Sequence, residues 1–99
     1  MIISAGYNIS GPEVEEALLA HESVAECAVV AAPDEKRGHV PKAFVVLAAN
    51  ANASDRLTTE LQDFVKQSIA PYKYPRVIEY IDALPKTQTG KIQRFALRT

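Results

Sequence analysis

Two apolar runs of strand length lie close together in the middle of the chain and limit the folds open to it. Val24–Ala32 is nearly continuous in small and β-branched residues, a pattern typical of a strand covered on both faces. A second apolar run, Lys42–Ala49, is centred on Phe44, Val45, Val46 and Leu47. Because a charged, turn-like segment (residues 35–39) separates the two runs, we expect the two strands to pair antiparallel.

A first helix is expected ahead of these strands. Pro12 suits its first turn, and Ser10 or Gly11 can cap it. The helix dipole favours acidic side chains near the start, and three follow: Glu13, Glu15 and Glu16. Helical spacing defines an inward face of Val14, Ala17, Leu18 and His21. We expect His21 to pack at the end of this face rather than to act as a ligand.

A second helix is expected after the two strands. Ser54 or Asp55 caps it and Pro71 stops it, with an inward stripe of Leu57, Leu61, Phe64, Val65 and Ile69. A third strand, Val77–Ala83, follows, and residues 92–97 can start a last helix. With a hairpin expected in the first ten residues, this order predicts an α+β fold: a small domain with an N-terminal β-hairpin and a three-stranded sheet packed by helices.

Length and composition point to one globular domain. The 99 residues are 47% hydrophobic and 23% charged, and a core of this size can fold without metals or disulfides. Cys27 is the single cysteine and lies within an apolar run, so we expect a buried core residue rather than a nucleophile. This suits a reducing cytoplasm. No apolar stretch approaches the roughly 20 residues of a membrane span, and we expect no membrane contact.

The charges are unevenly distributed, although they nearly cancel at −1. The segment Met1–Glu35 holds acidic side chains and no Lys or Arg, whereas beyond Asp82 only basic residues carry charge. An anionic partner would therefore meet the C-terminal end. Because no nucleic-acid motif accompanies these basic residues, a nucleotide or coenzyme A is the better-sized anion, and we expect no nucleic-acid partner.

The C-terminal segment Leu84–Arg94 reads LPKTQTGKIQR and combines two hydroxyls, a glycine and a lysine. Such groups can bind a phosphate or carboxylate oxygen. Gly90 allows a turn that a Cβ would obstruct, which would place Lys91 at the tip of a loop. Thr-Gly-Lys alone is often only a solvated surface turn. The segment is not a Walker phosphate loop, because the upstream glycine and the Ser or Thr after the lysine are both missing.

Taken whole, this segment resembles the C-terminal signature of the adenylate-forming acyl-CoA synthetase superfamily of AMP-binding enzymes. Residues 1–15 resemble the part of these enzymes that directly follows the hinge between their two domains. Three internal segments also match the family pattern: residues 24–30, 33–38 and 70–76. The resemblance therefore covers essentially the whole chain. Two short stretches are most similar to aryl-CoA ligases of the benzoate and 2-aminobenzoate type, namely Gly6-Tyr7-Asn8 and residues 71–76.

The resemblance implies that residues 1–99 form the C-terminal mobile (lid) domain of an ATP-dependent, AMP-forming acid–CoA ligase. Such an enzyme makes an acyl-adenylate from a carboxylic acid and ATP, and then an acyl-CoA thioester. The large N-terminal domain would hold ATP, Mg²⁺ and the acid, and it is absent here. We therefore expect this chain alone to be inactive. Its partners would be its own N-terminal domain, coenzyme A and a carboxylic acid, which the aryl-type motifs suggest is aromatic.

The resemblance also implies a role for each motif. Lys91 would be the catalytic residue of adenylation, within an ATP- or AMP-contacting loop of Thr87, Thr89 and Gly90. For thioester formation the domain would rotate, and the pantetheine tunnel would be bordered by Ala5, Gly6, Tyr7 and Asn8. The nucleotide end of coenzyme A would meet a basic-aromatic set of Tyr72, Lys73, Tyr74 and Arg76. No metal ligand is implied.

Three alternatives stay open from the sequence. The segment that holds the basic-aromatic set could be an extended linker whose tyrosines half-bury against the sheet. The enzyme could be an adenylation domain that loads a carrier protein, so that pantetheine arrives on a protein rather than as free coenzyme A. The chain could also be a non-enzymatic binding or dimerisation module. The acid that is activated cannot be read from these residues.

Overall fold

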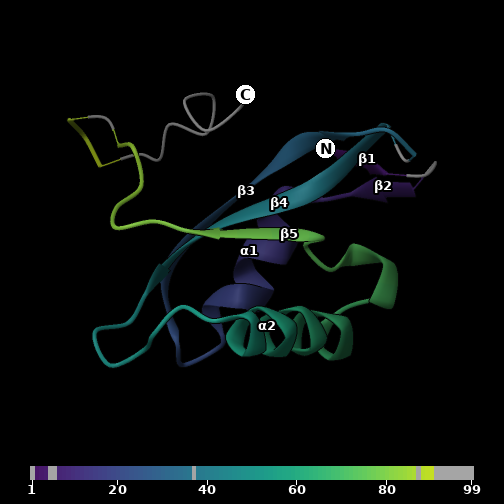
Figure 1. Ribbon diagram of the computed structural model, residues 1–99. Helices are drawn as coiled ribbons and strands as arrows, with labels where there is room; N and C mark the ends of the chain where they lie inside the picture. Colours follow the sequence, from purple (N-terminus) through teal and green to yellow (C-terminus); the bar gives the residue numbers. More distant parts are fainter. Residues whose placement is uncertain (1, 5–6, 37, 87, 91–99) are drawn as a thin grey trace.

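The computed structural model describes residues 2–4, 7–36, 38–86 and 88–90. These residues form one five-stranded sheet with two α-helices packed against it (Figure 1). The elements in chain order are β1 (Ile2–Ser4), β2 (Tyr7–Ile9), α1 (Gly11–Leu19), β3 (Val24–Asp34), β4 (Gly38–Leu47), α2 (Asp55–Ser68), the 3₁₀ helix η1 (Pro71–Lys73) and β5 (Val77–Tyr80).

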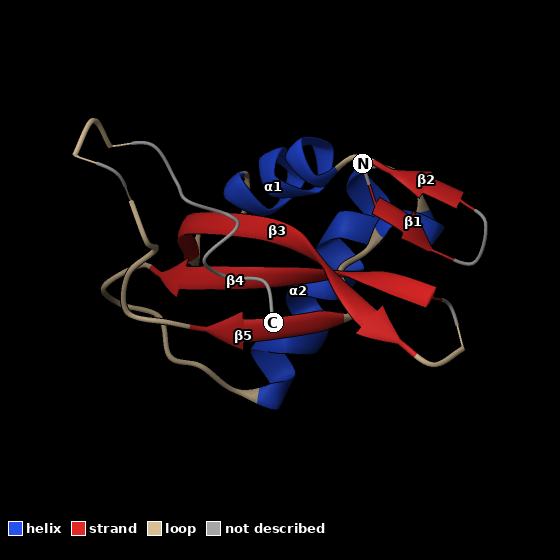
Figure 2. Ribbon diagram, turned by 90° about the horizontal axis from the view of Figure 1, so that it is seen from above, coloured by secondary structure: helices blue, strands red, loops and turns tan. Residues whose placement is uncertain are grey.

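The sheet has β4 at its centre, as Figure 2 shows from above. The predicted antiparallel pairing of β3 with β4 is confirmed and runs from Val24↔Leu47 to Asp34↔Gly38. On its other side β4 pairs in parallel with β5 and, at Ser4↔Gly38, with β1. The predicted α+β domain with its three-stranded sheet and packed helices is therefore confirmed. The N-terminal hairpin of β1 and β2 is not separate, because it extends this sheet.

Both long strands extend further toward their shared turn than their apolar residues predicted. We expected strands over residues 24–32 and 42–49, whereas pairing continues through Asp34 and begins again at Gly38. Backbone hydrogen bonds form independently of side-chain polarity, so the ladder continues beyond the apolar runs. The strand expected over residues 77–83 ends at Tyr80. The last helix, expected over residues 92–97, lies outside the described residues.

The two helices begin where the sequence predicted. Ser10 caps α1, and its Oγ accepts the N–H of Glu13 at 3.4 Å. Ser54 caps α2, and its Oγ accepts the N–H of Leu57 at 3.0 Å. The inward face predicted for α1 is buried throughout. On α2 the stripe is buried at Leu61 and Val65 and partly buried at its other three positions.

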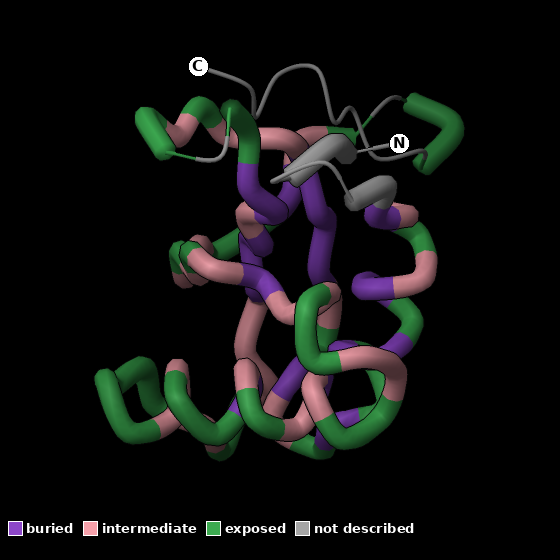
Figure 3. Tube along the Cα trace, turned by 90° about the vertical axis from the view of Figure 1, so that its right-hand side faces the viewer, coloured by how far each residue is buried: buried purple, intermediate pink, exposed green. Residues whose placement is uncertain are grey.

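Apolar residues cover both faces of the central strands. The larger cluster lies between the sheet and the helices, and includes Val14, Leu18, Cys27, Val45 and Leu61. The smaller cluster lies on the opposite face, called here the second face, and consists of Ala28, Val30, Phe44 and Leu84. Figure 3 shows the buried residues running through the middle of the molecule, with exposed residues around them. These two clusters explain why the apolar run of β3 is nearly continuous.

Glu15 closes part of the outer edge of β3, which α1 packs against (Figure 2). The carbonyls of Pro41 and Val45 accept hydrogen bonds from the β5 side. Backbone groups alternate in direction along a strand, so those of Ala43 also point toward β5. Val29 of β3 pairs with Ala43, and its N–H therefore points away from β4. Glu15 accepts this N–H through Oε2 at 2.7 Å and is only 7% exposed. The dipole argument for Glu15 said nothing of this contact, which buries its carboxylate against the strand.

Candidate functional site

The segment that leads toward Lys91 crosses the second face of the sheet. This crossing segment comprises residues 81–86 and starts at the end of β5. The N–H of Ile81 donates to a carbonyl of β4 at 3.0 Å. Leu84, 6% exposed, packs against β3 and β4 in the second-face cluster. Lys86 then forms an ion pair with Glu26 on β3. Ile81 thus anchors the segment to β4, Leu84 to β3 and β4, and Lys86 to β3.

The lysine loop continues from this anchored segment. Thr89 and Gly90 are exposed. Gly90 has a φ of 85°, in the left-handed region that favours glycine, which agrees with the turn expected there. Thr87 and Lys91 lie outside the described residues. The ATP- or AMP-contacting role of this loop remains a prediction.

The predicted pantetheine-bordering strip is described only in part. Tyr7 and Asn8 lie in β2, where they pair with Ser4 and Ile3 of β1. Ala5 and Gly6 lie outside the described residues. The strip is therefore attached to an end strand of the sheet, and its proposed role in the thioester step remains a prediction.

Lys73 of the basic-aromatic set is committed to an ion pair inside the domain. Its Nζ lies 2.5 Å from Glu13 Oε1, in the first turn of α1. This hydrogen bond raises the pKa of Lys73 above its ordinary value. The pair fixes η1 against the start of α1 and offsets the charge that we expected Lys73 to offer a phosphate.

The other three members of the set stay close together. Tyr74 has Lys66 Nζ at 4.3 Å and Arg76 Cζ at 4.9 Å from its ring centroid, both within cation–π range. Tyr72 is 43% exposed. Gln62 of α2 donates to the carbonyl of the buried Pro75 at 3.0 Å, which holds this part of the chain against the helix. The segment therefore presents the exposed ring of Tyr72 and, separately, two cations over the ring of Tyr74.

The two groups of predicted site residues lie at opposite ends of the domain. The ion pair between Lys73 and Glu13 places η1 beside the start of α1, which directly follows β2. Tyr7 and Asn8 are therefore on the same side as Tyr72. Thr89 and Gly90 follow the far end of β5, and Figure 1 shows this segment on the side away from η1 and the β1–β2 hairpin. The described members of the two groups therefore lie on different sides of the domain.

His21 and Cys27 have the packing roles predicted for them. His21 Nδ1 accepts the N–H of Ser23 at 3.0 Å, so Nε2 carries the proton of the neutral ring and lies 2.7 Å from Glu60 Oε2. The ring also meets Phe64 edge-to-face, with centroids 5.0 Å apart. Cys27 is buried, and its thiol donates to the carbonyl of Glu15 at 3.4 Å.

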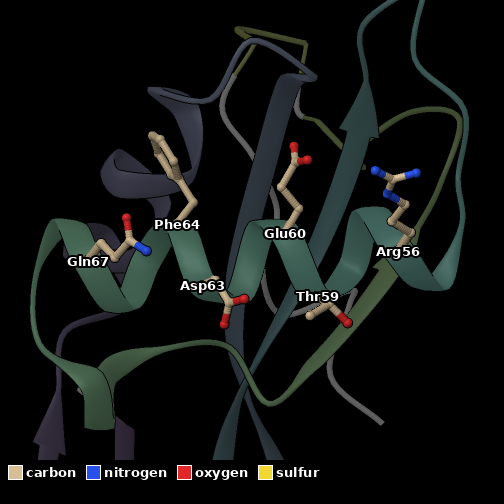
Figure 4. Close-up of a pocket in the computed structure, with 6 residues that line it drawn as sticks. All are labelled: Arg56, Thr59, Glu60, Asp63, Phe64 and Gln67. Atoms are coloured by element: carbon tan, nitrogen blue, oxygen red, sulfur yellow. The ribbon is translucent and has the colours of Figure 1, made fainter.

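A hollow of about 560 Å³ lies along the outer side of α2. Figure 4 shows its lining residues, all from this helix: Arg56, Thr59, Glu60, Asp63, Phe64 and Gln67. Glu60 and Asp63 are exposed there. Glu60 and Phe64 are also engaged with His21, and none of the predicted site residues lines the hollow.

Sequence reasoning missed the carboxylates that fix these segments. Glu13 binds Lys73 and Glu26 binds Lys86, and each partner lies far away in the sequence. Single-sequence patterns carry no signal for such distant pairs. Charge complementarity offered one hint, because the acids of the N-terminal third have no basic residues nearby in sequence.

Two general features of the site concern metals and membranes. Within the residues that the structure describes, no three His, Cys, Asp or Glu side chains come together in a way that could hold a metal ion. In the same part of the chain, no helix has both the length and the apolar character needed to cross a membrane.

Comparison with known proteins identifies the class to which this fold and these motifs belong. Residues 13–91 match the model of the AMP-binding enzyme C-terminal domain. The chain therefore belongs to the AMP-binding enzyme C-terminal domain family, and the resemblance inferred from its motifs is confirmed.

The relatives of this domain are acyl-CoA synthetases and ligases. The chain is 59% identical over 100 residues to the mitochondrial acyl-coenzyme A synthetase ACSM4 of Rattus norvegicus, with 99% of the chain and 17% of the relative covered. It is 54% identical over 99 residues to the benzoate–CoA ligase of Thauera aromatica, with 100% and 19% covered. The crystal structure of the Brucella canis acyl-CoA synthetase matches with a TM-score of 0.96 and 47% identity over 98% of the chain and 18% of that structure.

The chain thus spans less than a fifth of the length of these curated relatives. An acyl-CoA synthetase and an aryl-CoA ligase match it at similar identity. The domain itself therefore does not distinguish the acid that is activated.

Proposed function

We propose that this chain acts as the C-terminal lid domain of an ATP-dependent, AMP-forming acid–CoA ligase. The observation that carries the proposal is the anchored crossing segment, which leads from β5 over the second face to the loop that holds Lys91. The names of the relatives, which are CoA synthetases and ligases, support free coenzyme A as the acceptor rather than a carrier protein. A benzoate–CoA ligase among them agrees with an aromatic acid.

In the first half-reaction, a carboxylate oxygen attacks the α-phosphorus of ATP and pyrophosphate leaves. Both reactants carry negative charge, which opposes their approach. Lys91 offsets this repulsion and holds the two oxygens in line, while Thr87, Thr89 and Gly90 shape the loop around the phosphates. The left-handed φ of Gly90 supports a tight turn at this position.

In the second half-reaction, the sulfur of coenzyme A attacks the acyl carbonyl and AMP leaves. The domain turns its other end toward the active site for this step. Ala5, Gly6, Tyr7 and Asn8 border the pantetheine, and the basic-aromatic set lies near the nucleotide. Tyr72, Tyr74 and Arg76 supply most of this contact, because Lys73 is already bound to Glu13.

The rest of the machinery belongs to a large N-terminal domain in the same protein. That domain holds ATP, the acid and Mg²⁺. The described residues of this chain bring together no group of side chains for a metal ion, so the residues that would hold Mg²⁺ belong to the N-terminal domain. A cytoplasmic location is part of the proposal and rests on the single, buried cysteine, although several relatives are named as mitochondrial enzymes.

The half-reactions of a Lys91→Ala variant test this proposal in the full-length ligase. We expect the rate of acyl-adenylate formation, measured as pyrophosphate release, to fall by about 10²-fold. This is the scale of losing one preorganised electrostatic contact. Thioester formation from supplied acyl-adenylate should stay within about twofold of the wild-type rate, since Lys91 contributes only to the first step. Lys36→Ala, which removes an exposed lysine in the turn after β3, is the matched control. Equal losses in both half-reactions would contradict the two-step assignment.

A further inference from the structure

Glu26 reaches the crossing segment because β3 contains a bulge. The register of β3 against β4 shifts between Val24, which pairs with Leu47, and Glu26, which pairs with Val46. Side chains two apart on a regular strand share a face. Here Val24 packs in the core on the helix side, whereas Glu26 meets Lys86 of the crossing segment on the second face. One extra residue thus turns Glu26 to the other side of the sheet.

The partner of Glu26 sits at a defined point on the path toward Lys91. Leu84 fixes the preceding part of the crossing segment in the second-face cluster. Lys86 follows it and pairs with Glu26, and both side chains remain partly exposed, at 38% and 40%. Glu26 is therefore the point on β3 at which the chain is held before the lysine loop begins.

We propose that Glu26 and Lys86 are a positioning pair that sets where the lysine loop starts, and so tunes the adenylation step. The bulge supports this reading, since bulges re-aim side chains next to active sites. Neither residue touches the reacting atoms in this role. The pair acts through the backbone that leads to Lys91, and the inference rests on the proposed function of that loop.

The proposal predicts a moderate and step-specific effect. Partly exposed ion pairs contribute little energy, equivalent to roughly 1.4- to fivefold in an equilibrium. We therefore expect Glu26→Lys and Lys86→Glu each to slow acyl-adenylate formation by about fivefold in the full-length ligase, with thioester formation from supplied acyl-adenylate unchanged. The double exchange restores the opposite charges and should return adenylation to within about twofold of wild type.

A matched control comes from α2. Asp63 and Lys66 form a surface ion pair with side chains 57% and 39% exposed, and this pair lies outside the crossing segment. Asp63→Lys places like charges together just as Glu26→Lys does. It should leave the adenylation rate unchanged. A loss in Asp63→Lys equal to that in Glu26→Lys would show a general effect of surface charge and overturn the proposal.

Hydrogen exchange on the 99-residue chain tests, without any enzyme assay, whether the Glu26–Lys86 pair holds the crossing segment. Amides in the peptide spanning residues 81–90 should exchange faster in each single variant than in wild type, and the double exchange should restore their protection. Wild-type adenylation in both single variants, or equal losses in both half-reactions, would overturn the proposal. If the wild-type ligase forms no acyl-adenylate, the proposed function fails. Independently of that result, unchanged exchange in both single variants would show that the Glu26–Lys86 pair does not hold the crossing segment.

Discussion

Lys73 belongs both to the fold and to a predicted binding site. Its ammonium lies 2.5 Å from Glu13 Oε1, and this hydrogen bond raises its pKa. A group whose pKa is raised on folding contributes stability that is fully present below its unfolded pKa. That contribution is lost as the pH rises through the folded pKa.

The stabilising effect of Glu13 should therefore depend on pH. We expect Glu13→Gln to lower the free energy of unfolding near pH 9, where Lys73 is charged, and this effect to shrink as the pH rises through the raised pKa of Lys73. Urea unfolding at a series of pH values measures the difference between wild type and variant. Glu16→Gln, an exposed acid on the same helix, is the control for general charge effects. A pH-independent difference would argue against the ion pair.

Single residues were predictable where their surroundings are local in sequence. Helical spacing identified the packing role of His21, and an apolar run identified that of Cys27. The buried position of Glu15 could not be predicted, because it depends on an outward N–H from a strand that follows in the chain. The same holds for Glu26, since a bulge decides which face it occupies.

At the scale of elements, β4 begins at a glycine with a φ of 81°. No atom lies within 4 Å of the position that a Cβ would take at Gly38. A Cβ at this position would clash with no neighbouring atom, so the only cost of a substitution would be backbone strain. We expect Gly38→Ala to destabilise the domain by about 1–2 kcal/mol.

Gly38→Asn should cost less, because asparagine tolerates the left-handed region better than alanine. Urea unfolding of the two variants beside wild type measures both effects. Equal stability of all three proteins would show that the turn between β3 and β4 relaxes without cost.

Element types were predictable from periodicity, whereas their connections were less so. Helix caps at Ser10 and Ser54 and both long strands followed from the sequence. The pairing of the hairpin with β4 involves Ser4 and Gly38, too little to leave a pattern. The loop expected after β3 was partly strand, because pairing follows the backbone rather than the hydrophobic run.

For the whole molecule, we expect the purified 99-residue chain to fold cooperatively as a monomer. Its two apolar clusters share the strands β3 and β4 and so unfold as one unit. Circular dichroism and tyrosine fluorescence should give coincident urea transitions. The same protein should form no acyl-CoA from acid, ATP and coenzyme A, because these sites would lie on another domain. Measurable acyl-CoA production above that of a boiled sample would refute the assignment of these sites to another domain.

The family could be read from motifs at the two ends of the sequence, and the α+β fold from hydrophobic periodicity. The arrangement of those motifs in space could not. The path of β5 and the crossing segment leads the chain away from Tyr7 and Asn8 before it reaches Thr89 and Gly90. The roles of Lys91 and Gly6 remain predictions, since both residues lie outside the described part of the chain.

The carboxylate of Glu15 also affects how this domain meets copies of itself. A free strand edge can recruit a strand from another molecule, and such additions lead to dimers or aggregates. Glu15 occupies the outward N–H of Val29 in the middle of β3, and α1 covers the same edge. An incoming strand would have to displace a buried charge before it could form a hydrogen bond at that point. The long strand β3 is therefore protected from intermolecular pairing at this point, which weighs against self-association through this edge.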